Sequence, residues 1–106
     1  MSFSVKTETF DNVAKLTLTG ELDSSTAPQL MEEINKVIPQ RPSELVMDFE
    51  QLDFMASAGL RVIIFAKQKL GTAAKLFMVK PQEQVLETLR MTGLIYSVTI
   101  VEHYPE

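Results

Sequence analysis

Ser57 is the side chain in this sequence that is best placed to take part in chemistry. It follows the short apolar run Leu45–Met47, which is typical of a central strand buried on both faces, and it precedes a helix-like segment. Open α/β sheets gather functional groups where a strand's carboxyl end leads into a helix. The N–H groups and positive dipole end of a helix N-terminus accommodate a phosphate. Ser57 is therefore a candidate phosphoacceptor, and the alternative is a plain helix N-cap, whose loss costs about 1 kcal/mol.

Polar side chains elsewhere could share this rim with Ser57. The run from Asp23 to Thr26 either lines the same rim or caps the helix that follows it. Arg61, one turn into the second helix, carries a fork of donors that pairs with a phosphate or a carboxylate, although a solvated surface arginine is the simpler interpretation. Gly59 lets the first turn of that helix approach a neighbouring backbone.

The sequence offers no motif for catalysis or metal binding. Asp48 and Asp53 lack the spacing of a metal site, and His103, the single histidine, has no serine or acid partner by spacing. The four glycines stand singly, so they form neither a phosphate-binding loop nor a nucleophile elbow. The lack of cysteine excludes thiolate catalysis and sulfur-ligated zinc. We therefore expect no enzyme activity, no cofactor and no metal.

Charge and hydropathy restrict the partners. Ten basic and fourteen acidic side chains give a net charge of -4, which opposes binding to nucleic acid. No apolar run approaches the roughly 20 residues of a membrane span, and the start does not resemble a signal peptide. The length of 106 residues and the 45% hydrophobic content suit one folded domain. We expect a single domain over residues 1–106, located in the cytoplasm, without nucleic acid as a partner and without membrane insertion.

Apolar spacing in the first part of the chain predicts a hairpin and then a helix. Apolar and polar residues alternate from Phe3 to Thr7 and from Val13 to Leu18, and Asp11-Asn12 fits the tight turn between them. Apolar residues at three-and-four spacing between Ala27 and Ile38 predict a helix. Two prolines that follow closely are expected to end it.

The segment 59–70 is ambiguous, because its β-branched and aromatic residues also suit a strand. Its length, the lysines near its end and Gly71 after it favour a helix, with Ser57 available as its cap. The strand before it is predicted at residues 45–48, with a loop from Phe49 to Ala56 in between.

The remaining sequence continues the alternation of strands and helices. The apolar run Leu76–Val79 predicts a buried strand. A helix is expected to start at Pro81 and to end at Gly93, and a last strand is expected at residues 97–101. This order predicts an α/β fold. We expect a single layer of four to five strands, mixed but mostly parallel, with three or more helices packed against it.

Three segments of the chain together resemble a STAS domain. They are Gly20–Asp23, Leu45–Phe49 followed by Phe54–Arg61, and Met91–Leu94. The resemblance covers essentially the whole chain, with the elements in the same order. Stand-alone STAS proteins of this size resemble the anti-sigma factor antagonists of bacterial sporulation and stress responses.

The resemblance implies a regulatory binding protein. In that family, an unphosphorylated antagonist binds an anti-sigma factor that is also a serine kinase with a histidine-kinase-like ATPase fold, and so frees the sigma factor. The kinase uses ATP to phosphorylate one serine at the N-terminus of the second helix, which breaks the complex, and a PP2C-type phosphatase restores it. The family motif Asp-Ser-(Ser/Thr/Ala)-Gly-Leu places that serine at Ser57. Ala56 stands where the motif has aspartate, which either weakens kinase recognition or removes a like charge beside the phosphate.

The same resemblance implies a binding surface around Ser57. It combines the loop after the second strand, the segment from Phe54 to Leu60 and the exposed side of the second helix, including Phe65. The residues expected to contact the partner are Asp23, Ser24, Ser25, Thr26, Met55, Ala56, Ala58, Gly59, Leu60 and Arg61. The alternative function is a STAS subunit of a membrane-lipid ABC transporter complex, which acts without phosphorylation.

Overall fold

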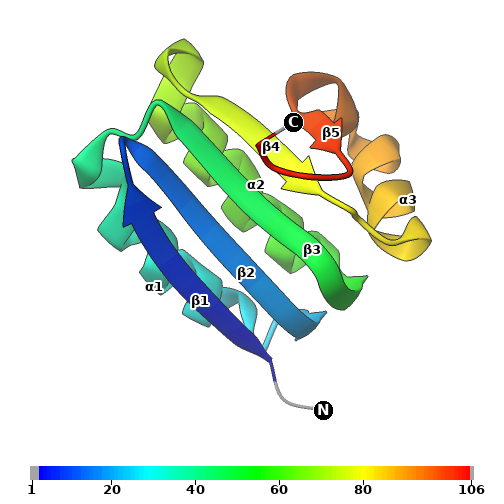
Figure 1. Ribbon diagram of the computed structural model, residues 1–106. Coiled ribbons are helices and arrows are strands. Elements are labelled where there is room, and N and C mark those ends of the chain that lie inside the picture. Colours follow the sequence, from blue (N-terminus) through cyan, green and yellow to red (C-terminus); the bar gives the residue numbers. More distant parts are fainter. Residues whose placement is uncertain (1–2, 106) are drawn as a thin grey trace.

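The computed structural model describes residues 3–105 and contains one mixed sheet in that range (Figure 1). Met1, Ser2 and Glu106, which the predicted domain includes, lie outside the described residues. The strands follow one another across the sheet in chain order, with β1 antiparallel to β2 and the remaining pairs parallel. Their bounds are β1 Ser4–Phe10, β2 Val13–Leu22, β3 Glu44–Met55, β4 Lys75–Val79 and β5 Thr99–Val101. The expected mixed, mostly parallel sheet is confirmed.

Three α-helices connect the parallel strands, and in Figure 1 α1 and α2 lie behind the sheet while α3 lies at its right-hand side. They are α1 Ala27–Val37, α2 Ser57–Leu70 and α3 Glu83–Thr92. Short 3₁₀ turns follow them at η1 Ile38–Gln40, η2 Gly71–Ala73 and η3 Leu94–Ser97. The helical interpretation of residues 59–70 is confirmed, and the helix begins two residues earlier.

The opening hairpin forms as the alternation predicts. Phe10 pairs with Val13, so Asp11 and Asn12 make a two-residue turn with φ of 47° and 67°. A two-residue turn with positive φ at both positions matches the right-handed twist of the strands it joins. Asp and Asn tolerate this backbone better than most residues.

β3 is longer than predicted, because the expected loop from Phe49 to Ala56 is strand as far as Met55. The pairing with β2 shifts register near Thr19 and again near Gly20, and such bulges break the strict alternation of buried and exposed residues. The order of apolar and polar residues after Asp48 therefore does not predict a strand. As a result, Ser57 follows the strand after a single connecting residue, Ala56.

Two elements near the C-terminus also differ from the prediction. α3 begins at Glu83, and Gln82 takes the extended N-cap conformation, so Pro81 lies outside the helix. The last strand begins at Thr99, because the residues before it form η3. Gly93 ends α3 in the left-handed conformation with φ of 78°, as expected of a glycine at that place.

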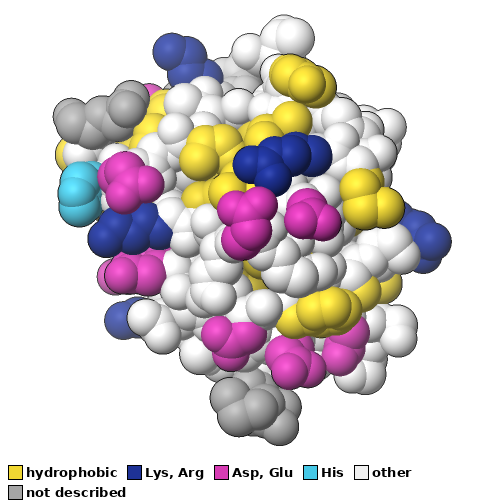
Figure 2. Space-filling model, turned by 90° about the vertical axis from the view of Figure 1, so that its right-hand side faces the viewer, with side chains coloured by type: hydrophobic (Ala, Val, Ile, Leu, Met, Phe, Trp, Pro, Cys, Tyr) yellow, Lys and Arg dark blue, Asp and Glu magenta, His cyan; other side chains and the backbone are white. Residues whose placement is uncertain are grey.

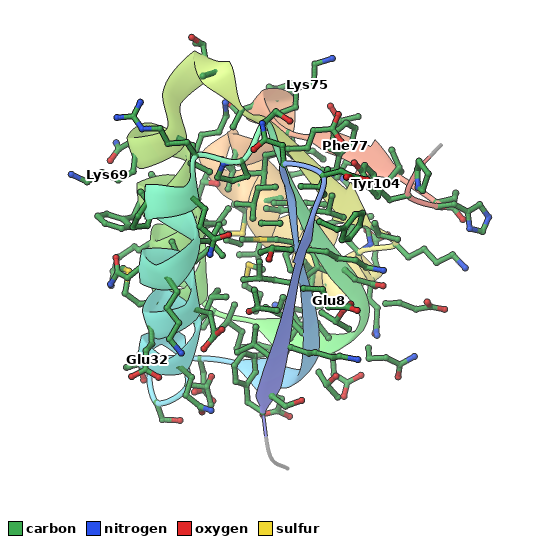
Figure 3. The ribbon with its side chains drawn as sticks, turned by 60° about the vertical axis from the view of Figure 1, so that its left-hand side comes forward. Glu8, Glu32, Lys69, Lys75, Phe77 and Tyr104 are labelled. Atoms are coloured by element: carbon green, nitrogen blue, oxygen red, sulfur yellow. The ribbon has the colours of Figure 1, made fainter. Side chains whose placement is uncertain are left out.

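The two faces of the sheet are buried to different extents. The helix face carries the main core, in which the largest fully buried side chains from the sheet include Phe49, Leu16, Leu18, Met47 and Met78. The opposite face holds a small cluster of Val46, Val79 and Val101, against which Phe77 and Tyr104 pack. Figure 3 shows Phe77 and Tyr104 together on the side of the sheet away from α1 and α2.

Candidate functional site

The start of α2 leaves the Ser57 side chain exposed. Ala56 continues the extended backbone of β3, with φ of -94° and ψ of 172°, and takes the N-cap position itself. The Ala56 carbonyl accepts hydrogen bonds from the N–H groups of Gly59 at 3.1 Å and Leu60 at 3.3 Å. Ser57 is the first helical residue, and α2 has no side-chain N-cap hydrogen bond. The alternative interpretation of Ser57 as the helix N-cap is therefore wrong, because β3 continues to Met55 and the N-cap position falls on Ala56.

The electrostatic surroundings of Ser57 favour an anion. Ser57 stands at the N-terminus of a 14-residue helix whose first turn contains no acidic residue, and whose last turn contains Lys67 and Lys69. The helix dipole therefore places partial positive charge beside the Ser57 hydroxyl, and the basic residues lie at the far end. A phosphate attached to this hydroxyl would be stabilised by the dipole and by the first N–H groups of the helix.

The polar run after β2 forms a closed turn. The Asp23 carboxylate accepts hydrogen bonds from the Ser25 hydroxyl at 2.7 Å and the Ser25 N–H at 2.9 Å, and a longer one from the Thr26 N–H. These bonds, with the Ser25 hydroxyl first, hold the pKa of Asp23 below its usual value of 3.8. Thr26 is the N-cap residue of α1 but makes no side-chain cap. The cluster thus stabilises its own turn and does not cap α1 through a side chain.

The sheet brings this turn and Ser57 together. Leu22, the last residue of β2, pairs with Met55, the last residue of β3. The Ala56 N–H donates to the Leu22 carbonyl at 2.8 Å, which extends the pairing past the end of both strands. Asp23 and Ser57 therefore leave neighbouring parallel strands at the same edge of the sheet. This juxtaposition fits the alternative in which the run from Asp23 to Thr26 lines the same rim as Ser57.

The predicted contact residues divide into three classes of exposure. Exposed ones are Ser24, Ser25, Ser57 and Arg61, half-buried ones are Asp23, Thr26, Ala56 and Ala58, and buried ones are Met55, Gly59 and Leu60. The side chains of Met55 and Leu60 point into the core and are not available to a partner in this conformation. For these buried residues the expected direct contact does not fit the structure, because they form the floor under the exposed rim.

Gly59 faces a side chain, whereas the sequence suggested a neighbouring backbone. A Cβ atom at Gly59 would lie 2.4 Å from the Cγ atom of Leu22, which is fully buried. Real Cβ atoms essentially never approach a heavy atom so closely. Glycine is therefore what allows α2 to pack against the end of β2.

The structure adds two side chains to the site that no sequence pattern predicts there. Gln84 and Thr88 of α3 hydrogen-bond the backbone of Met55, two residues before Ser57. These contacts join residues 29 and 33 positions apart, so no local spacing pattern reveals them. Phe54, in the predicted contact segment, is 38% exposed and adds an apolar surface beside the rim.

Figure 2 shows the side of the molecule that carries α3 and the carboxyl ends of β2 and β3. Acidic side chains are spread over this side among separate groups of hydrophobic ones. A surface of this kind offers both apolar contact area and charge that a partner must complement.

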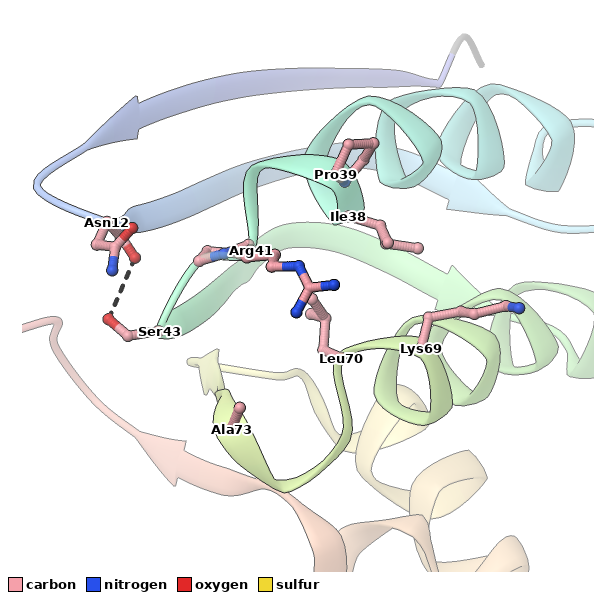
Figure 4. Close-up of a pocket in the computed structure, with 9 residues that line it drawn as sticks. Asn12, Ile38, Pro39, Arg41, Ser43, Lys69, Leu70 and Ala73 are labelled. Carbon is pink, nitrogen blue, oxygen red and sulfur yellow. Dashed lines mark hydrogen bonds between the residues drawn. The ribbon is translucent and has the colours of Figure 1, made fainter.

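A separate pocket of about 410 Å³ lies at the opposite end of α2. Figure 4 shows Arg41 reaching from the loop after η1 toward Leu70, with the Ser43 hydroxyl bonded to the Asn12 carbonyl at 3.2 Å. The Lys69 ammonium lies 5.7 Å from the centre of the Phe65 ring. This pocket is at the C-terminal end of the helix, so it is not part of the Ser57 site.

Residues 3–105 carry neither a metal-ligand cluster nor a helix able to span a membrane. No group of three or more potential ligands among His, Asp and Glu gathers there to hold a metal ion. No helix in this range is long and apolar enough to cross a membrane.

Known proteins resemble the chain along most of its length. RsfB of Mycobacterium tuberculosis, named as an anti-sigma-F factor antagonist, is 30% identical over 93 residues, which cover 88% of this chain and 76% of RsfB. The crystal structure of an anti-sigma factor antagonist from Mycobacterium paratuberculosis superposes with a TM-score of 0.87 at 27% identity, covering 97% of this chain and 88% of that one.

Two structures of SpoIIAA share the fold at lower identity, and the phosphorylated one is described as the Bacillus cell fate determinant. The unphosphorylated form has a TM-score of 0.82 at 22% identity, covering 94% of this chain and 90% of that one. The phosphorylated form has a TM-score of 0.73 at 21% identity, covering 96% of this chain and 93% of that one.

The family assignment rests on the whole chain and not on the Ser57 segment alone. The STAS domain family matches residues 4–106, a range that includes every strand and helix of the structure. The long β3, the connection through Ala56 and the helix that begins at Ser57 all lie within this match. The chain belongs to the STAS domain family.

Proposed function

We propose that this protein is an anti-sigma factor antagonist whose partner binding is controlled by phosphorylation of Ser57. The observation that carries the proposal is the position of Ser57, exposed at the first residue of α2 and beside the Asp23 turn. The names of RsfB and of the Mycobacterium paratuberculosis protein support the same function.

In the proposed cycle, the unphosphorylated protein binds an anti-sigma factor that is also a serine kinase of the histidine-kinase-like ATPase fold. The Ser57 oxygen attacks the γ-phosphorus of ATP, its proton passes to a base of the kinase, and ADP leaves. A PP2C-type phosphatase later hydrolyses the phosphoserine with water and releases inorganic phosphate. The protein itself supplies the acceptor hydroxyl and its position, and acts as a single domain in the cytoplasm.

Release follows from the charge that the phosphate adds. A phosphoserine carries roughly -1.5 to -2 charges at neutral pH, and the complex would have to desolvate that charge. A penalty of about 3 kcal/mol lowers affinity by about a hundredfold. The dipole of α2 stabilises the phosphate in the free protein, so phosphorylation need not unfold the helix start.

The proposed contact surface is the exposed rim that lies over the buried residues Met55, Gly59 and Leu60. Ser24, Ser25, Arg61 and Phe54 present side chains to a partner, while Ala56 and Ala58 offer only small apolar area. Arg61 lies one helical turn from Ser57 on the same side of α2, so its guanidinium can pair with a carboxylate of the partner. Because Ala56 replaces an aspartate of the family motif, this rim carries one acidic group fewer beside the phosphoacceptor.

A pull-down with three variants tests the proposal. Wild type and Ser57→Ala should both capture a protein that mass spectrometry identifies as having a histidine-kinase-like ATPase fold, and Ser57→Asp should lose it. Thr72→Asp is the matched control and should still capture the partner, since it adds the same charge at an exposed position in η2, at the opposite end of α2 and outside the proposed contact surface.

Each other outcome has a definite meaning. Capture by Ser57→Asp at the wild-type level contradicts the switch. Capture of ABC transporter subunits in place of a kinase supports the alternative role in a membrane-lipid transporter complex.

A further inference from the structure

The end of β3 extends beyond the strand next to it. β4 pairs with β3 only as far as Val79 opposite Asp48, whereas β3 continues to Met55. On its other side β3 stays paired with β2 up to Leu22. The backbone groups of residues 49–55 that point toward the β4 side therefore need partners other than a strand.

Side chains of α3 and the residue before it take the place of the missing strand. The Gln84 amide oxygen accepts from the Met55 N–H at 2.8 Å, and the Gln84 amide nitrogen donates to the Met55 carbonyl at 3.2 Å. The Thr88 hydroxyl, one turn further along α3, donates to the same carbonyl at 3.2 Å. Gln82 donates to the Glu50 carbonyl at 2.9 Å, further from the helix start.

The backbone before Ser57 is thus held from both sides. Gln84 and Thr88 bind Met55 from α3, and the Leu22 carbonyl of β2 accepts the next N–H, that of Ala56. The Ala56 carbonyl then accepts the first N–H groups of α2. The anchored residues lead directly into Ser57, so the anchor fixes the backbone from which the Ser57 side chain projects.

We infer that Gln84, assisted by Thr88, is a positioning residue for the Ser57 switch. This inference rests on the proposed function and adds that α3 takes part in it. Phosphoryl transfer depends on placing the acceptor oxygen in line with the phosphate, and a misplacement of about 1 Å can cost a hundredfold in rate. Removing the Gln84 bonds should therefore slow phosphorylation even though Gln84 lies outside the predicted contact surface.

Gln84→Met tests this inference, because methionine has a similar length but makes neither amide hydrogen bond. Gln82→Met is the matched control, since it removes one backbone hydrogen bond of the same kind at Glu50. Amide hydrogen exchange of the purified protein, measured by NMR, should become at least tenfold faster at Met55 and Ala56 in Gln84→Met. The control should leave exchange at these two residues as in wild type.

Phosphorylation kinetics then separate positioning from simple destabilisation. With ATP and the kinase identified by the pull-down, Gln84→Met should lower kcat about tenfold or more and leave KM within about twofold. A loss of folding would instead remove active protein from all measurements, which circular dichroism detects. Gln82→Met should match wild type in both constants.

Unchanged exchange at Met55 and Ala56 in Gln84→Met would overturn the inference without involving any kinase. Faster exchange with unchanged kcat would also overturn it. If wild type receives no phosphate on Ser57 at all, the proposed function fails, and that result is distinguishable because it precedes any comparison of variants.

Discussion

At the scale of single residues, the site depends on two small residues, Gly59 and Ala56. Gly59 leaves room for the buried Leu22 side chain, and Ala56 continues the strand into the N-cap position without a side chain that reaches the helix. Ser57 consequently stands exposed at the helix start. The motif segment positions the serine through close packing beneath it as much as through the serine's own contacts.

Gly59→Ala should destabilise the fold. The added Cβ would lie 2.4 Å from the Cγ atom of Leu22. Overpacking of this kind typically costs about 1–3 kcal/mol, whereas replacing glycine by alanine in a helix gains about 1 kcal/mol. We expect the packing cost to outweigh the gain, because the separation is far below van der Waals contact. Urea unfolding followed by circular dichroism measures the difference. Ser57→Ala is the control in the same helical turn and should stay within about 0.5 kcal/mol of wild type. Equal midpoints for the two variants would show that Leu22 moves aside freely.

The Asp23 turn makes a prediction about pH. Its hydrogen bonds lower the pKa of Asp23 in the folded protein, so the stability they contribute is present above the ordinary value of 3.8 and is lost as pH falls through the lowered pKa. NMR titration of the Asp23 carboxyl should place its midpoint below 3.8. Ser25→Ala should raise that midpoint, since the Ser25 hydroxyl is the largest cause. Ser24→Ala, the neighbouring control, should leave it unchanged, and an equal shift in both variants would contradict this assignment.

At the scale of elements, the C-terminal segment covers part of the sheet face that the helices leave open. Tyr104 packs on Phe77 with ring centres 5.3 Å apart and donates a hydrogen bond to Glu44 at the start of β3. Under it lie Val46 and Val79, which are buried although no helix covers them. The segment after β5 therefore acts as a strap over the smaller of the two apolar clusters.

The strap should detach at high pH. The hydrogen bond to Glu44 is the largest cause that raises the pKa of Tyr104 from 10 to about 12. Because the folded-state pKa is raised, the stability from this bond is present below pH 10 and is lost as pH rises toward 12. In a Tyr96→Phe background, which leaves Tyr104 as the single tyrosine, phenolate absorbance should have its midpoint near 12. Adding Glu44→Gln should lower that midpoint, and no change would show that Glu44 is not the cause.

The elements also show what the sequence can and cannot predict. The hairpin, α1 and the end of α3 at Gly93 follow from alternation, helical spacing and a glycine, all of which are local signals. The second half of β3 does not follow from local signals, because bulges in its pairing with β2 disturb the alternation of buried and exposed residues. The pattern also predicts the start of α3 too early, since Pro81 lies in the turn before the helix and is not its first residue.

At the scale of the whole molecule, the predicted site is assembled from three separate parts of the chain. The turn after β2, the start of α2 and two side chains of α3 meet at one edge of the sheet. The first two could be expected from sequence, because parallel strands end at the same edge. The contribution of Gln84 could not be expected from sequence. Its partner, the backbone of Met55, is available only because β3 extends past the end of β4.

The affinity of the protein for its partner, with and without phosphate on Ser57, tests the central claim most directly. Calorimetric titration of the captured kinase should use wild type before and after complete phosphorylation, with the modified residue confirmed by mass spectrometry. We predict that Kd rises at least tenfold on phosphorylation, which corresponds to about 1.4 kcal/mol. Equal affinity of the two forms, or a phosphate that still appears in Ser57→Ala, would contradict the account.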